Sequence, residues 1–594
     1  MMPSILPAIP ITPPKGGVRP DLNALEIGLA GLVDGENWLF SKGEFRSRPG
    51  LAKMGTTLGS RPVGVTYYDL PSLKGNIVVM TTRGWWAWDA TPEAWVDLTA
   101  TGAILTISVN AGGTGYAPGD TGTIGAGAAT YSVTTAPAGV VTAVSLTAGG
   151  TGYSVATGVS TTATSGGGSG LKLNILTQSG QLTGSATTIG VFRLFEKSGV
   201  QYLVGVNGKD HPKVWDQDLT TPSDFRDLAD SPPHASCMAV CANRMLLANF
   251  TASAGSSQAI IYSDFNNFDN GWSTCVETLL ADTPGEIMAL REMGNLSFAI
   301  YKRDSIYMGM AQGGADPFAY QMAASHCVGP ASPDAVISDA VGRHIFLGYD
   351  GGVYVFDGTR PVSMGDHIRD HIRSYADFDR FGRSFGTYDW ERNMAWFWYP
   401  RVLGADTNAA VAIDVSSGAC WPMRWPGLYF GAAAKPIIVT AIRIGELTMP
   451  IGSITLTLGE MTRRRPNLLV GEIGGQVYVD TGLDDDGTAI PVALETGLTD
   501  GGSPSTFKTV TASDHQFLKT TSSQALSVDL GSSEYGEAPT YDGAQSLGAL
   551  SSGGPWEAGH RSTGRLFSVK LTGNVTDEVS WRGSSLAVAS RGVR

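Results

Sequence analysis

Cysteines are scarce in this sequence, and a long apolar run is missing. The 594 residues include five cysteines, an odd number spread widely along the chain, which argues against a disulfide framework and suits a reducing cytosol. No stretch approaches the roughly 18 to 20 uninterrupted apolar residues that a membrane helix needs. The first 20 residues hold six prolines where a signal peptide needs an apolar core, so we expect a protein made and used without secretion or membrane insertion.

Positive charge is also in deficit. Lys and Arg number 41 against 54 Asp and Glu, which gives a formal net charge of -13 and a pI near 5.1. Net attraction to nucleic acid is therefore not expected, because phosphate binding depends on concentrated Lys and Arg. DNA would pass such a surface without sticking to it. The hydrophobic fraction of 42%, with 14 Trp, 19 Tyr and 20 Phe, is ample for a buried core, and the length indicates several domains.

One segment lacks charge almost entirely. Residues 101–180 contain only Asp120 and Lys172 as charged residues and are dominated by Gly, Thr, Ala, Ser and Val. Within them, NAGGTGY at 110–116 returns as TAGGTGY at 147–153. This change of composition predicts an inserted small β-domain.

Short runs that mix aromatic and β-branched residues recur along the rest of the chain and end in Asp or Gly, which is the pattern of β-strands. From Asp216 onward the interval is 45 to 66 residues. Such a period is typical of a β-propeller, whose blades pack radially because a lone four-stranded sheet cannot bury both faces. Seven runs and an opening hairpin predict six to eight blades; the runs are RGWWAWDA near Asp89, HPKVWDQ near Asp216, AIIYSDF near Asp264, RDSIYMG near Gly309, GGVYVFDG near Asp357, AAVAIDVSSG near Asp414 and GGQVYVD at Asp480.

The full pattern predicts an all-β protein, namely a β-propeller of six to eight blades with an inserted small β-domain and a C-terminal β-sandwich. The expected boundaries are an extended arm at 1–26, the propeller at 27–100 and 181–483, the insert at 101–180 and the sandwich at 484–594. One short helix is expected at 365–378, capped by Asp366, with Ile368, Ile372 and Tyr375 on one face.

Two motifs of enzymes are present only in fragments. GRSFG at 382–386 matches a nucleophile elbow, but that elbow needs a strand before the serine and a helix after it, and here the order is reversed. Ser384 is therefore not expected to be catalytic. His367 and His371 have the spacing of zinc ligands, yet residue 368 is Ile and no third ligand is near in sequence, which favours packing or solvated histidines.

Three further motifs have structural explanations. Cys237 and Cys241 share a strand face but lack a second cysteine pair, which favours buried thiols. Asp484 to Asp486 precede a glycine as in a calcium turn, but the ligand pattern is incomplete, so a solvated interdomain linker is favoured and a bound ion stays open. YSDFNNFDNGW at 262–272 is similar to the Asp-containing turns of sialidase-type propellers, where those turns are structural. We expect no catalytic residue, no metal site and no cofactor.

Arginines gather at two places. The segment ENWLFSKGEFRSRPGL at 36–51 predicts two strands joined by a turn, with Arg46 and Arg48 on one face. TRRRP at 462–466 adds a run of three, Arg463, Arg464 and Arg465, for which a solvated face is the alternative. Because a guanidinium fork binds carboxylates with two nitrogens, we expect Arg46 and Arg48 to meet acids on a neighbouring strand, domain or subunit. The five arginines together form a candidate protein interface.

With NWLFSKGEFRSRPGL at the start, DGGVYVFDG in the blades and GRLFSVKLTG followed by WRGSSLAV at the end, the chain resembles the β-propeller nozzle or hub proteins of short-tailed bacteriophages. The matching positions are Asn37, Arg46, Arg48, Pro49 and Gly50 at the opening and Gly564, Arg565, Phe567 and Trp581 near the end. The resemblance covers most of the chain outside 101–180.

This resemblance implies a structural protein of the virion tail, present in the host cytoplasm before assembly. It implies a homo-oligomeric ring, commonly hexameric, that extends the portal and adaptor as a DNA ejection conduit and carries fibres or spikes. DNA would pass through it without specific binding, and no membrane span is expected. Two alternatives stay open: a receptor-binding tail fibre or baseplate component, and a propeller glycosidase or depolymerase.

Overall fold

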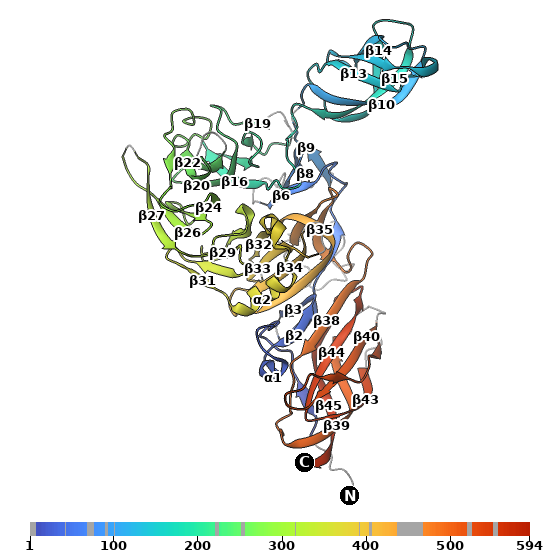
Figure 1. Cartoon of the computed structure of the whole chain (residues 1–594), viewed down its shortest axis with the longest axis vertical. Helices are drawn as coiled ribbons and strands as arrows, with labels where there is room; N and C mark the ends of the chain where they lie inside the picture. Colours follow the sequence, from blue (N-terminus) through green and yellow to red (C-terminus); the bar gives the residue numbers. More distant parts are fainter. Residues whose placement is uncertain are drawn as a thin grey trace, which may run out of the picture.

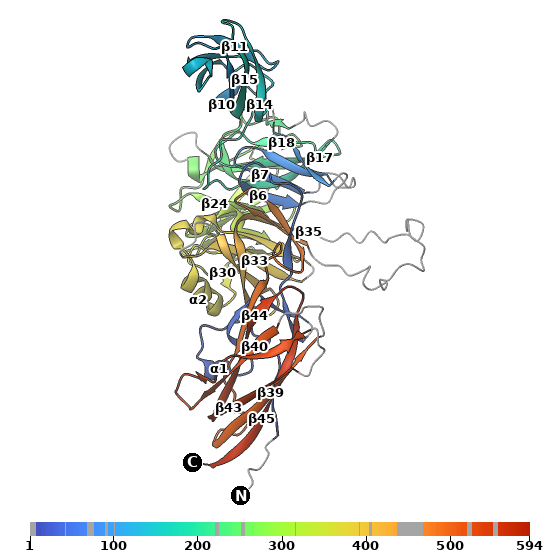
Figure 2. The ribbon, with the colours of Figure 1, turned by 90° about the vertical axis from the view of Figure 1, so that its right-hand side faces the viewer.

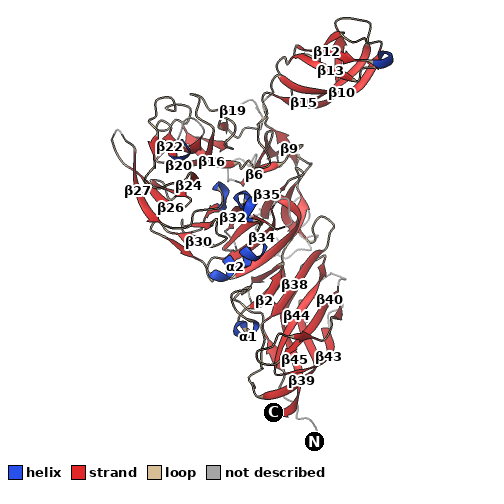
Figure 3. Cartoon of the chain, in the orientation of Figure 1, coloured by secondary structure: helices blue, strands red, loops and turns tan. Residues whose placement is uncertain are grey.

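The computed structural model shows a chain built almost entirely of β-strands, which confirms the predicted all-β class (Figures 1 and 3). Three bodies follow one another along the long axis: the insert, the propeller and the sandwich (Figure 1). The structure describes residues 7–41, 43–67, 77–89, 93–99, 101–219, 225–250, 256–314, 316–390, 392–402, 407–435, 467–518, 525–550 and 556–593.

The described residues form seven propeller blades. Five blades are separate four-stranded antiparallel sheets. In chain order they are β6 (Pro62–Tyr67), β7 (Ile77–Thr81), β8 (Trp85–Asp89) and β9 (Ala94–Asp97); β16 (Val191–Lys197), β17 (Val200–Val206), β18 (Lys213–Trp215) and β19 (Arg226–Asp227); β20 (Ala235–Cys241), β21 (Arg244–Phe250), β22 (Ala259–Tyr262) and β23 (Thr278–Leu279); β24 (Ile287–Glu292), β25 (Ser297–Lys302), β26 (Ser305–Ala311) and β27 (Phe318–Ser325); β28 (Val336–Ser338), β29 (His344–Leu347), β30 (Val353–Phe356) and β31 (Pro361–Ser363).

The sixth and seventh blades share one sheet because a single long strand, β35 (Cys420–Lys435), serves both. Its first residues complete the sixth blade beside β32 (Phe385–Asp389), β33 (Met394–Pro400) and β34 (Thr407–Asp414). Its second half pairs with β36 (Asn467–Glu472), followed by β37 (Val477–Gly482) and, from near the start of the chain, β5 (Gly50–Lys53). The second half of β35 also packs against β6 of the first blade. These contacts place the seventh blade against the first and so close the ring.

The seven aromatic runs seen in the sequence are the third strands of the seven blades, β8, β18, β22, β26, β30, β34 and β37. Their pattern has a physical cause, since a blade buries both of its faces against neighbours. In β8, Trp85 packs in the core shared with the second blade, whereas Trp86 and Trp88 pack against the core shared with the seventh. Strands buried on both faces read as nearly continuous apolar runs. The prediction of six to eight blades is confirmed, and the number is seven.

The sandwich takes strands from both ends of the chain. One sheet has the order β3 (Trp38–Ser41), β4 (Glu44–Ser47), β45 (Ser580–Val593), β39 (Thr506–Phe517) and β43 (Trp556–Gly564), and β1 (Ile9–Ile11) also pairs with β45. The other has the order β2 (Leu32–Glu36), β38 (Ile490–Thr496), β44 (Leu566–Val575), β40 (Ala525–Ser533) and β41 (Thr540–Tyr541), with β42 (Gln545–Ala549) on β40. The predicted C-terminal sandwich is confirmed.

The predicted boundary between arm and propeller is wrong. Residues 27–49 were expected to open the propeller, yet β2 pairs with β38 and β4 with β45, so the propeller begins at β5. The arm at 1–26 docks on the same sandwich through β1 and continues into the short helix α1 (Ala24–Ile27). The cause is aromatic packing: the Phe45 ring stacks on Trp581 and meets Trp421 edge-on. The local alternation of apolar and polar residues predicts a strand, but it does not predict the distant strand with which it pairs.

The insert is a six-stranded sheet in the order β10 (Ile104–Thr114), β15 (Ser169–Gln178), β14 (Ala156–Ala163), β11 (Thr121–Ile124), β12 (Ala129–Thr135) and β13 (Ala143–Ala148). It curls until β10 and β13 touch, around its own apolar core (Figure 2). Its two GGTGY copies share one backbone shape. Gly113 and Gly150 have φ of 59° and 61°, and Gly115 and Gly152 have 79° and 77°, a region that favours glycine.

The insert should be removable, because its entry and exit are held together. Ser179 N donates to Ala103 O at 2.8 Å, and Ala103 N donates to Ser179 Oγ at 2.9 Å. We expect that replacing residues 104–178 by a short Gly-Ser linker leaves the propeller melting temperature within about 4 °C of the full chain, as measured by calorimetry. A much larger drop would show that the insert supports the propeller.

Helix α2 (Asp366–Tyr375) occupies the expected place, at the end of the propeller that faces the sandwich (Figure 1). Ile368 and Ile372 are buried as predicted, but Tyr375 is 39% exposed. Gly365 is the N-cap residue in place of Asp366, which instead forms an ion pair with Arg369 at 2.7 Å.

Candidate functional site at the junction of propeller and sandwich

Arg48 lies where the sandwich passes into the propeller, between β4 and β5. Its guanidinium is fully buried and binds the Asp485 carboxylate with two nitrogens, Nη1 to Oδ1 at 2.8 Å and Nη2 to Oδ2. Nε donates to Asn37 Oδ1 at 3.0 Å, and Nη2 also donates to Arg424 O at 3.0 Å. The guanidinium carbon is 4.5 Å from the centroid of the Trp425 ring. We call this group, centred on Arg48 and Asp485, the Arg48 clasp.

The clasp joins both domains. Asn37 belongs to the sandwich, Arg424 and Trp425 lie in β35 of the propeller, and Asp485 lies on the connection from β37 to β38. A planar guanidinium with fixed donor directions suits this task because it satisfies a carboxylate, an amide oxygen and a carbonyl together. The clasp therefore fixes how the two domains meet.

Arg46 has a different environment from Arg48. It binds Glu44 through Nε at 2.9 Å and Glu578 through Nη1 at 3.2 Å, and its side chain is 35% exposed. Both arginines contact carboxylates of this same chain, but they do not form one surface. Arg48 is engaged within the chain, and residues 463–465, the other arginines of the expected interface, lie outside the described residues.

The three aspartates at 484–486 were expected to form a solvated linker, but they are engaged one by one. Asp485 is 4% exposed and holds Arg48. Asp486 pairs with Lys53 of β5 at 2.6 Å, and Asp484 Oδ1 accepts from Gly487 N at 2.9 Å. The expectation of solvation is wrong for Asp485, because the buried arginine requires a buried partner.

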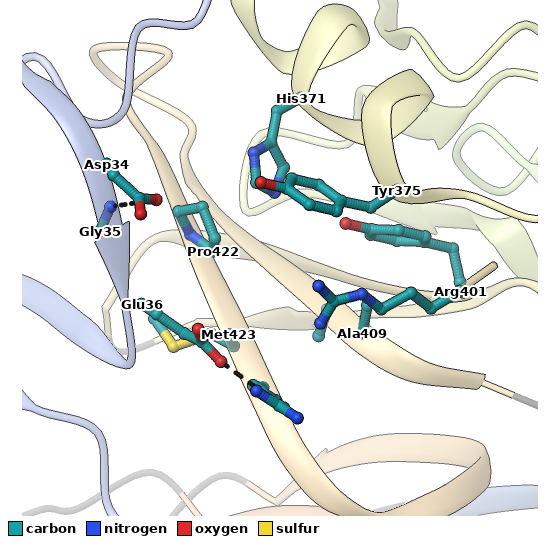
Figure 4. A pocket seen from close by; sticks show the side chains of 12 residues that line it. Asp34, Gly35, Glu36, His371, Tyr375, Arg401, Ala409, Pro422 and Met423 are labelled. Atoms are coloured by element: carbon teal, nitrogen blue, oxygen red, sulfur yellow. Dashed lines mark hydrogen bonds and ion pairs between the residues drawn. The ribbon is translucent and has the colours of Figure 1, made fainter. Parts of the chain in front are cut away.

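Beside the clasp, a cavity of about 80 Å³ lies between sandwich and propeller (Figure 4). Its charged and titratable lining residues are Asp34 and Glu36 from β2, His371 and Tyr375 from α2, and Tyr399, Arg401 and Arg424 from the propeller. Glu36 Oε1 lies 3.8 Å from Arg424 Nε, and burial raises the pKa of the Glu36 carboxyl. The two acidic and two basic side chains of the described lining balance in charge, which suits polar contact between the two docked domains.

His371 forms part of the wall of this cavity. Its ring lies 5.1 Å from the Tyr375 ring, and burial, assisted by the nearby Arg401 charge, lowers the pKa of the imidazole to about 4. His367 Nε2 lies 2.9 Å from Gly418 O. The two histidines are held by packing and backbone contact, as expected.

The remaining sequence motifs are structural. Ser384 is buried and its hydroxyl donates to Phe381 O at 2.8 Å. Cys237 and Cys241 face the next blade, and burial raises the pKa of both thiols to about 12. The segment 262–272 is a blade turn after β22, in which Trp272 Nε1 donates to Phe268 O at 2.8 Å.

The described residues hold no cluster of three or more His, Cys, Asp or Glu side chains able to bind a metal ion. Over the same stretches of chain, no helix is long and apolar enough to cross a membrane.

An ion pair also crosses the inner face of the propeller. Arg193 of β16 binds Glu292 of β24 through Nε at 2.9 Å, and Val240 N of β20 donates to the same carboxylate at 2.8 Å. The second and fourth blades are not neighbours, so this pair passes in front of the third. The pair thereby links three consecutive blades.

A series of buried hydrogen bonds inside the sandwich was not predicted from the sequence. It runs from Trp581 through Ser584, His515, Ser513 and His560 to Asp542, with steps of 3.2, 2.6, 2.8, 2.8 and 2.7 Å. Ser513, His560 and Asp542 have the contact order of a hydrolase triad. However, Ser513 is 1% exposed and a second histidine occupies its hydroxyl, so a substrate has no access.

The two end residues of this hydrogen-bond series determine which nitrogen of each histidine carries the proton. Trp581 can only donate and an ionised Asp542 can only accept, so every bond between them points the same way. We expect His515 to carry its proton on Nε2 and His560 on Nδ1, each observed by ¹⁵N NMR of the imidazole rings. The opposite tautomer at either histidine would contradict this assignment.

Comparison with known proteins adds no family. No family model matches the chain, and no curated protein matches it. Solved structures similar to it include one titled "Crystal Structure of Mitotic Checkpoint Complex" (9% identity, TM-score 0.35, covering 73% of this chain and 94% of that one). Another is titled "Structure of Dos1 propeller" (10% identity, TM-score 0.34, 74% and 96%). The β-propeller is thus defined by the strand pairing of this chain itself.

Proposed function

We propose that this chain is a structural protein of a bacteriophage tail, a nozzle or hub subunit that forms part of the DNA ejection conduit and a platform for fibres or spikes. The observation that carries the proposal is the way the propeller and the sandwich are joined. The ring is closed by β5, the sandwich contains strands from both ends of the chain, and the Arg48 clasp fixes one domain to the other. A closed ring of blades has no open edge between its first and last blades, which suits a body that bears force.

The electrostatics support the same role. A chain with a net charge of -13 repels phosphate, so DNA stays mobile beside it. In this proposal the conduit is formed between subunits arranged in a ring, with DNA passing along their surfaces.

The first test is assembly. Native mass spectrometry and electron microscopy of the purified chain are expected to give a closed ring, with six subunits as the expected number. Electron cryo-microscopy of phage particles that contain the chain should place that ring at the distal end of the tail. A monomer at all concentrations together with absence from the tail would contradict the proposal.

Activity gives the second test. The purified chain is expected to release no reducing sugar from capsule or cell-wall polysaccharide. Release of sugar would favour the glycosidase or depolymerase alternative, and a trimer that binds host cells would favour the fibre alternative.

A further inference from the structure

A second cleft, of about 90 Å³, lies between the first blade and the insert, far from the Arg48 clasp. Blade residues that line it include Arg83, Trp86 and Asp97, and insert residues include Ser154, Val155 and Gln178. Gln181, just after the insert, lines it as well. Ligand sites form preferentially where two domains meet. The sequence indicated no role for these residues.

Backbone hydrogen bonds frame the cleft on both sides. Gly102 and Tyr153 exchange two bonds of 2.9 Å, which hold Ser154 and Val155, just after the second GGTGY copy, over the blade. On the exit side, Leu182 N donates to Arg83 O at 2.8 Å and Gly184 N donates to Thr82 O at 3.0 Å. The two walls are thus fixed relative to each other.

The blade wall combines an aromatic ring with a carboxylate. Trp86 on β8 and Asp97 on β9 are directly opposed in the strand register, so their side chains stand next to each other on one face. Trp86 is half-buried and backed by the core between the first and seventh blades. Asp97 Oδ1 accepts from Thr99 N at 2.8 Å.

The polar groups are not consumed by ion pairing. Among the described residues, neither Asp97 nor Arg83 forms an ion pair, although both line the same cleft; the Arg83 guanidinium donates to Leu176 O at 3.4 Å. Although Asp97 is exposed, the protein atoms around its carboxyl partly desolvate it and so raise its pKa. A ligand hydroxyl that donates to this carboxylate would replace part of the lost solvation.

We propose that this cleft binds one sugar ring of a glycan, with Trp86 as the apolar platform and Asp97, Arg83 and Gln181 as polar partners. A pyranose has an apolar C–H face that suits an aromatic ring, and a rim of hydroxyls that both donate and accept. The cleft offers a carboxylate acceptor, a guanidinium donor and an amide that does both. The opposite charges of Asp97 and Arg83 favour an uncharged ligand over a phosphate or a metal ion.

This inference does not rest on the tail proposal, because it concerns only the cleft and its chemistry. The test uses the full chain and four free sugars, namely glucose, galactose, mannose and N-acetylglucosamine, in saturation-transfer NMR. At least one sugar is expected to receive magnetisation at its ring protons. Replacing residues 104–178 by a linker, which removes one wall, is expected to abolish the signal.

Two variants and one control decide the outcome. Asp97→Asn, at an exposed position, is expected to weaken binding by about tenfold or more, because the ligand hydroxyl then donates to a neutral amide oxygen in place of a charged carboxylate. Trp86→Leu should abolish transfer, whereas Trp390→Ala, which removes an exposed tryptophan in another blade, should leave it unchanged. No transfer to any of the four sugars, retention of binding in Asp97→Asn, or loss in Trp390→Ala would overturn the proposal.

Discussion

Replacing Arg48 by methionine is expected to lower the free energy of unfolding by about 3 to 5 kcal/mol, the loss typical when one partner of a buried ion pair is removed. Asp485 would be left as an uncompensated charge at 4% exposure, and Asn37 Oδ1 and Arg424 O would each lose a donor. Urea unfolding followed by tryptophan fluorescence measures this loss, since Trp425 lies against the guanidinium.

Two controls separate the clasp from a general effect of arginine. Arg46→Ala, which breaks a half-exposed pair with Glu44 and Glu578, is expected to change stability by less than about 1 kcal/mol. The double variant Arg48→Met with Asp485→Leu should lose less than about 2 kcal/mol, because no buried charge remains unpaired. Equal losses for Arg46→Ala and Arg48→Met would show that the clasp has no special role.

The second large effect concerns pH and His371. Burial lowers the pKa of its imidazole from 6.5 to about 4, so below pH 6.5 the unfolded chain binds a proton that the folded chain does not. Stability contributed by this site is complete above pH 6.5 and is lost as the pH falls toward 4. The loss reaches about 2 to 3 kcal/mol by pH 4.5.

His371→Phe tests this site alone, whatever other groups titrate. Phenylalanine keeps a ring beside Tyr375 and cannot take a proton. At pH 8 the difference in unfolding free energy between variant and wild type reports packing only. At pH 4.5 the variant should be more stable by about 2 to 3 kcal/mol relative to that difference. A difference that does not vary with pH would mean that His371 titrates normally.

Features set by local pattern could be predicted from the sequence. The aromatic runs ending at Asp89, Asp216 and Asp357 belong to strands that bury both faces, so composition alone marks them. The uncharged segment 101–180 with its GGTGY repeat is the insert, since glycines with positive φ and the buried Tyr116 and Tyr153 recur together. Pairing of Arg48 with a carboxylate followed from the geometry of the guanidinium.

Features set by distant partners could not be predicted. Nothing near residues 36–51 indicates that β4 pairs with β45, or that β5 completes the seventh blade. The partner of Arg48 is 437 residues away in the sequence. The series of hydrogen bonds from Trp581 to Asp542 joins strands that share no sequence motif. Only the tertiary structure, which brings these residues into contact, identifies them as partners.

The sequence by itself determined that this protein is all-β, that its ring has between six and eight blades, and where the insert interrupts it, because each depends on which side chains a strand must bury. Only the tertiary structure decided which strand closes the ring, to which domain the first hairpin belongs, and where the junction and insert clefts lie. The physical reason is that a strand edge can pair with any strand of suitable register, and the choice among them is made by packing between segments far apart in the chain.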